Sequence, residues 1–149
     1  MSARSKARKR ALDVLFEADA KGLPPMEVLA ATEDRRREDG QAEMNPYVTV
    51  LVMGVRDHQG EIDDLLGSYS MGWTLDRMPA VDRAILRLGA FEILWSTEVP
   101  EAVAISEAVT LATELSTDDS PSFVNGLLGR LLELKPRLVL DPGPAATTA

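Results

Sequence analysis

Residues 79–95, PAVDRAILRLGAFEILW, decide the fold that this sequence can adopt. A proline at the start is typical of the first turn of a helix, and apolar residues then recur at helical spacing. A second apolar patch, which includes Leu86 and Ile93, lies roughly opposite the main stripe. A helix that is apolar on more than one side is either central in the core or carries a second interface. The main stripe consists of Val81, Ala84, Ile85, Leu88, Phe91 and Trp95.

Helical spacing recurs on both sides of this stretch, and we find no strand-like alternation of useful length. The segment 67–73 is rich in turn residues and separates two halves of about three helices each. We therefore predict an all-α fold in one domain, 1–139, with sub-bundles at about 4–67 and 74–135 and a disordered tail at 140–149. The other helices are expected at about 4–21, 26–37, 45–66, 104–115 and 122–134, with a short helical piece after Thr74.

The composition excludes several classes of function. The chain has 149 residues with 16 basic and 24 acidic side chains, a net charge of -8, one histidine and no cysteine. Without cysteine there is no disulfide, thiolate zinc site or cysteine nucleophile, and one histidine excludes a multi-histidine metal site. No signal peptide is recognisable and no apolar run is long enough to span a bilayer, so we expect a cytoplasmic protein.

The positive charge is concentrated at the start of the chain. The remaining 139 residues carry 11 basic and 24 acidic side chains, and a basic arm on an acidic body is typical of a nucleic-acid contact. Phe16 lies off the apolar stripe of the first helix and almost in line with Lys9, which places a ring beside cations, as single-stranded RNA requires. The alternative is that Phe16 packs beneath another helix and that the arm is only solvated. The five basic residues are Arg4, Lys6, Arg8, Lys9 and Arg10.

Two further segments offer polar contacts. Asp76 and Asp82 can present carboxylates to a basic protein partner, or they are ordinary acids that the helix dipole favours near a helix N-terminus. In the segment 116–126, Asp119 can accept hydrogen bonds from a base edge or cap the last helix. Phe123 is either a residue at the rim of the core or a second exposed ring.

Four segments carry a resemblance to a known family, and they occur in its order and spacing. They are ARKRALDVLFEAD (7–19), VDRAILRLGAFEIL (81–94), VPEAVAISEAVTLA (99–112) and ELSTDDSPSFVNGLLG (114–129). Through them the chain resembles the NusB family of bacterial transcription antitermination factors over about Lys6 to Leu134. The wording GWTLDR and LSTDDSP resembles an actinobacterial version. The resemblance implies an all-helical fold of two packed three-helix bundles.

The resemblance also implies a function and a set of contacts. Family members bind the boxA element of nascent ribosomal-RNA transcripts together with NusE, a ribosomal protein, and join other Nus factors on RNA polymerase. On this chain, NusE contacts would fall on Asp76, Asp82 and Leu86. RNA contacts would fall on Arg4, Lys6, Arg8, Lys9, Arg10, Phe16, Asp119 and Phe123, where Phe16 replaces a tyrosine of some relatives.

Two other functions compete with RNA binding. In the first, the protein is an acidic helical adaptor that binds only basic ribosomal or transcription proteins. In the second it is an enzyme, which we do not expect because no nucleophile, base and orienting group can be placed together. We likewise expect no cofactor, no metal and no membrane partner. A homodimer is compatible with the sequence.

Overall fold

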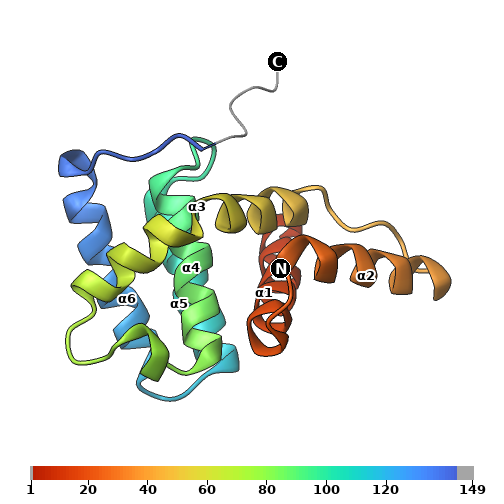
Figure 1. The fold of residues 1–149 in the computed structure, drawn as a ribbon, viewed down its shortest axis with the longest axis horizontal. Coiled ribbons are helices and arrows are strands. Elements are labelled where there is room, and N and C mark those ends of the chain that lie inside the picture. The colour runs from red at the N-terminus through yellow and green to blue at the C-terminus, as the bar shows by residue number, and fades with distance from the viewer. Residues whose placement is uncertain (1, 144–149) are drawn as a thin grey trace.

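The computed structural model describes residues 2–143, and within this range the regular secondary structure is helical (Figure 1). Helices α5 and α6 begin slightly earlier than the sequence predicts. Helix α5 begins directly after Pro100, and α6 includes Pro121, because the first turn of a helix tolerates proline. No helix in this range is long and apolar enough to cross a membrane. The elements are α1 (Ala3–Lys21), α2 (Pro25–Glu38), α3 (Tyr47–Tyr69), η1 (Leu75–Arg77), α4 (Ala80–Leu94), α5 (Glu101–Leu115), α6 (Ser120–Leu134) and η2 (Lys135–Arg137).

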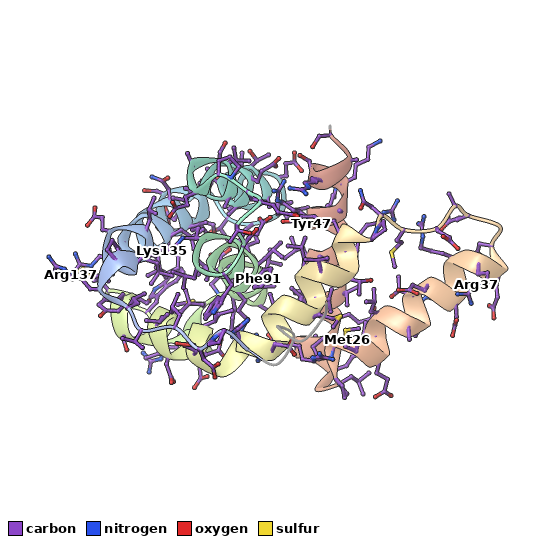
Figure 2. The ribbon with its side chains drawn as sticks, turned by 90° about the horizontal axis from the view of Figure 1, so that it is seen from above. Met26, Arg37, Tyr47, Phe91, Lys135 and Arg137 are labelled. Carbon is purple, nitrogen blue, oxygen red and sulfur yellow. The ribbon has the colours of Figure 1, made fainter. Side chains whose placement is uncertain are left out.

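The helices form two packed bundles, α1–α3 and α4–α6, as the sequence predicts. Helix α4 lies at the centre, because it packs against α5 and α6 of its own bundle and against α1 and α3 of the other (Figure 1). Helix α2 is peripheral, and its far end at Arg37 projects from the body (Figure 2). The core therefore lies around α4, and α1 packs against α4 from the N-terminal bundle.

Burial explains why α4 occupies the centre. Twelve of its fifteen residues are buried, including every position from Ala84 to Leu94. Each large aliphatic side chain that leaves water contributes about 1.5–3 kcal/mol to folding. Gly54 allows α3 to approach closely, because a Cβ at this position would lie 2.2 Å from the ring of Phe91. The apolar surface around α4 is thus used by the fold itself.

Charged side chains of α4 join the two bundles. Arg83 donates two hydrogen bonds to Asp19 of α1, at 2.7 and 3.0 Å. One turn later, Arg87 donates to Asp63 of α3 at 2.8 and 3.0 Å. Near the other end of α4, Glu92 is buried and accepts hydrogen bonds from α1 and α3. These contacts fix the position of α1 at two points along its length.

The segment 138–143 returns across the body of the protein. The indole N–H of Trp95 donates to the backbone carbonyl of Asp141 at 2.8 Å, and leucines of this segment pack against the core. The first residues of the predicted tail thus contact the body of the protein through Leu140 and Asp141. Residues 144–149 lie outside the described part of the chain.

Candidate nucleic-acid interface

Helix α1 has one face in the core and another in solvent. It begins at the cap residue Ser2, whose side chain accepts a hydrogen bond from the backbone N–H of Ser5 at 3.1 Å. It ends at Gly22, whose φ of 65° lies in the left-handed region that glycine adopts readily. The apolar stripe that the sequence predicts is buried as expected: Ala7, Ala11, Val14, Leu15 and Ala18.

The outward face of α1 carries cations and one aromatic ring. Lys6 and Arg10 are exposed and Lys9 is half-buried. Over residues 2–143, none of these three cations has a carboxylate within ion-pair distance. Phe16 is 38% exposed, so it does not pack beneath another helix. At 100° per residue, Lys9 and Phe16 lie within about 20° of each other, which places the ring and the ammonium group on one face.

Arg8 does not belong to this face, and the structure corrects the prediction that it contacts RNA. Its side chain is buried, and its Nε lies 2.9 and 3.1 Å from the two carboxylate oxygens of Glu92. One terminal nitrogen donates to Glu107 at 3.2 Å. Burial alone would lower the pKa of Arg8, but the hydrogen bond and charge of Glu92, together with Tyr47 and Glu107, raise this pKa. A guanidinium in this position joins the bundles and is not available to phosphate.

The first turn of α1 has one residue that faces solvent, Arg4, and one that faces the protein, Ser5. Arg4 donates to Glu98 at 3.1 Å and lies over the ring of Tyr47, 4.6 Å from its centroid, but its side chain remains 44% exposed. Ser5 faces inward and donates a hydrogen bond to Glu107. Tyr47 donates to the buried Glu92, and burial together with this bond raises the pKa of Tyr47. Arg4 is therefore accessible to a ligand that can compete with Glu98.

A second group of candidate residues lies at the start of α6. Asp119 is exposed, and its side chain makes no capping hydrogen bond to α6. Phe123 is half-buried and packs against Trp73, with 5.0 Å between ring centroids and a tilt of 57°. Trp73 is itself 38% exposed. Trp73 is not among the candidate residues identified from the sequence. The signal that could have identified it is a large aromatic residue in a turn-rich segment. It follows Gly72, whose φ of 88° only glycine adopts readily.

Two of the three residues expected to contact NusE, Asp82 and Leu86, are buried in the structure. Asp82 is fully buried and accepts hydrogen bonds from the hydroxyls of Ser116 and Ser120. Leu86 is also fully buried, because α4 is covered on both of its apolar sides. Neither side chain is available to a partner in this structure. Asp76, in η1, is exposed.

The first turn of α4 connects the two groups of candidate residues. Asp82 holds the start of α6 through Ser120, the neighbour of Asp119. Arg83, the next residue, holds the end of α1 through Asp19, which lies one turn after Phe16. The outward ring of α1 and the exposed polar start of α6 are therefore attached to the same end of α4.

This arrangement has the chemistry of a single-stranded nucleic-acid surface. Lysine and arginine side chains without carboxylate partners can neutralise phosphates, and exposed rings offer faces on which bases stack. Exposed carboxylates such as that of Asp119 can accept hydrogen bonds from base edges. Among residues 2–143 no group of acidic or histidine side chains is placed to hold a metal ion.

Comparisons with known proteins identify the family to which the chain is similar. The chain matches the NusB family over residues 5–133. It is 58% identical to the transcription antitermination protein NusB of a Nocardioides species over 93% of this chain and 99% of the relative. It is also 58% identical to the NusB protein of an Arthrobacter species, again over 93% and 99% of the two chains.

Solved structures resemble the whole fold. NusB of T. maritima superposes with a TM-score of 0.78 at 27% identity, over 93% of this chain and 99% of that chain. A structure described as antitermination factors NusB and NusE in complex with dsRNA superposes with a TM-score of 0.76 at 26% identity, over 89% and 98% of the chains. With a matching family model over most of its length and relatives at 58% identity, the chain belongs to the NusB family.

Proposed function

We propose that this protein is a transcription antitermination factor that binds the boxA RNA of nascent ribosomal-RNA transcripts together with NusE. The observation that carries the proposal is the outward face of α1, where Phe16 is exposed and Lys6, Lys9 and Arg10 have no carboxylate partner among residues 2–143. On a chain with a net charge of -8, such a cluster has little structural use. Binding to a phosphate chain with unstacked bases accounts for both the cations and the ring.

Affinity on this surface comes mainly from the cations. Arg4, Lys6, Lys9 and Arg10 can each neutralise a phosphate, whereas Arg8 is excluded because it is buried. For four contacts to a single strand, log K is expected to fall with log salt at a slope of about -2.8. Stacking on Phe16 and Phe123, with Asp119 at a base edge, adds preference for unpaired bases.

A basic protein partner complements the acidic body. NusE is the partner proposed here, and the exposed Asp76 is the residue of the predicted contact set that remains available to it. Support comes from the related structure described as NusB and NusE in complex with dsRNA. The combined surface repels RNA less than this chain alone, because the partner adds positive charge. We place the complex with other Nus factors on RNA polymerase, in the cytoplasm.

The test is a salt titration with matched charge variants. Binding of fluorescein-labelled boxA RNA, a scrambled RNA and the same boxA RNA in a duplex is measured by anisotropy, with and without NusE. The double variant Lys9→Ala and Arg10→Ala should reduce the slope by about 1.4. Controls are Arg37→Gln and Arg137→Gln, which remove exposed cations at opposite ends of the molecule (Figure 2).

The adaptor hypothesis predicts a different result. If the double variant and the controls bind RNA equally, while NusE binds with unchanged affinity, the protein acts through protein contacts alone. If wild-type protein prefers the unpaired boxA RNA and only the α1 variants lose that preference, the RNA-binding function stands.

A further inference from the structure

Asp13 differs from the other carboxylate on the outward face of α1. Glu17, one turn later, lies 3.1 Å from the amine of Lys21 and 4.0 Å from the guanidinium of Arg35. Asp13 is exposed, and nothing in the described range 2–143 pairs with it as a cation or a side-chain hydrogen-bond donor. The two acids therefore have different explanations, and that of Glu17 is a pair of ion contacts within the protein.

The position of Asp13 places it between the cations and the ring. Lys9 and Arg10 lie one turn before it and Phe16 lies one turn after it, at spacings that bring Cβ atoms within about 5–6 Å on a helix surface. Partial desolvation by protein atoms raises the pKa of Asp13, and Lys9 and Arg10 oppose that rise. The Asp13 carboxylate is thus exposed beside two cations, and no side-chain donor among residues 2–143 bonds to it.

An unpaired carboxylate on this face works against phosphate binding unless the RNA itself supplies a donor. An ionised carboxylate accepts hydrogen bonds through two oxygens and donates none. A base stacked on Phe16 directs its hydrogen-bonding edge along the helix surface, where Asp13 is a neighbour at i-3. The charge is repulsive toward the backbone of every RNA, but it is compensated when the base offers N–H groups.

We propose that Asp13 reads the edge of the base that stacks on Phe16 and favours guanine. The Watson–Crick edge of guanine presents N1–H and the N2 amino group side by side, which match the two oxygens of one carboxylate. Uracil, cytosine and adenine each present a single donor group on that edge. This inference rests on the proposed function, because it requires RNA to lie on α1.

The experiment measures base preference separately from affinity. Anisotropy titrations use short oligouridine RNAs that carry a single central guanine, adenine or cytosine, with the full-length protein. Wild-type protein should bind the guanine probe about tenfold more tightly than the adenine probe, the discrimination expected of a bidentate contact. Asp13→Ala should bring this ratio close to one. Affinity for the adenine and cytosine probes should rise, since a negative charge leaves the cationic face, whereas the guanine probe should gain nothing, because it loses the bidentate contact. Glu17→Gln is the matched control, which removes the neighbouring charge and should keep the guanine preference.

The outcomes separate this inference from the proposed function. If Phe16→Ala weakens all probes but Asp13→Ala retains the wild-type guanine ratio, Asp13 is only a repulsive charge and the inference is overturned. The inference is also overturned if Glu17→Gln abolishes the guanine preference as completely as Asp13→Ala, because the effect is then one of charge alone. If wild-type protein binds neither the oligouridine probes nor boxA RNA, the proposed function itself fails.

Discussion

Arg8 and Lys9 are neighbours in the sequence and belong to opposite surfaces of one helix. Arg8 is buried against Glu92 and Glu107, whereas Lys9 points outward beside Phe16 and has no carboxylate partner within residues 2–143. A run of basic residues is therefore divided between two roles: Arg8 joins the bundles, and its outward neighbours are the cations that we propose contact RNA. Arg8 and Lys9 contribute equally to the charge of the segment, and their positions on the helix place them on opposite faces.

The largest effect that tests this comparison is on folding. Arg8→Ala leaves Glu92 buried without its cation, and breaking a buried ion pair in this way costs about 3–5 kcal/mol. Lys9→Ala removes a surface cation and should change the free energy of unfolding by less than about 0.5 kcal/mol. Urea denaturation followed by circular dichroism measures both. Arg8→Lys keeps the charge without the planar fork, so it should fold with intermediate stability.

Equal destabilisation by Arg8→Ala and Lys9→Ala would contradict the division of α1 into an inner and an outer face. The order should reverse for RNA affinity. Here Arg8→Lys represents the inner face, because it should remain folded, and it is compared with Lys9→Ala. Lys9→Ala then loses affinity and salt dependence, whereas Arg8→Lys retains both.

The second effect concerns the ring on the outer face. Phe16→Ala should weaken binding of boxA RNA by about 1–3 kcal/mol, because one stacked base loses its platform. Phe16→Tyr should bind like wild type, since the aromatic face is kept. Leu23→Ala is the control, because this exposed apolar residue lies just beyond the end of α1. Electrophoretic mobility shifts at fixed salt measure all three, and equal losses for Leu23→Ala and Phe16→Ala would exclude a specific stacking role.

The fold and the apolar face of α1 could be predicted from the sequence because helical spacing is a local signal. The burial of Arg8 could not, since its partner Glu92 lies 84 residues away in the sequence. A trace of it was present, because Arg8 shares helical spacing with Leu12 and Leu15, which are both buried.

Asp82 shows the same limit on the acidic side. The helix dipole favours an aspartate in the first turn of a helix, and this position alone is compatible with either a contact to a partner or an ordinary helix-terminal acid. Its burial is accompanied by hydrogen bonds from the hydroxyls of Ser116, at the end of α5, and Ser120, at the start of α6. Contacts between segments this distant require the tertiary structure.

A third effect compares the two aromatic groups. Trp73→Ala should weaken RNA binding by about 1 kcal/mol, less than Phe16→Ala, because Phe123 still offers part of its ring. In a Trp95→Phe background, Trp73 is the remaining tryptophan, and its fluorescence should be quenched as RNA is added. Met71→Ala, in the same loop and 92% exposed, is the control. Unchanged fluorescence on saturation with RNA would remove Trp73 from the interface.

The smallest effect concerns Arg4, which belongs to both surfaces. Its contact with Glu98 is exposed, and pairs of this kind contribute about 0–1 kcal/mol. RNA phosphate must displace Glu98 to reach the guanidinium, so Glu98→Gln should strengthen RNA binding by up to about fivefold at low salt. The gain should disappear at high salt, where exposed charges are screened. Glu133→Gln removes an exposed carboxylate from α6 and serves as the control. A gain of equal size in both variants would mean that the net charge of the protein, and not competition for Arg4, sets the affinity.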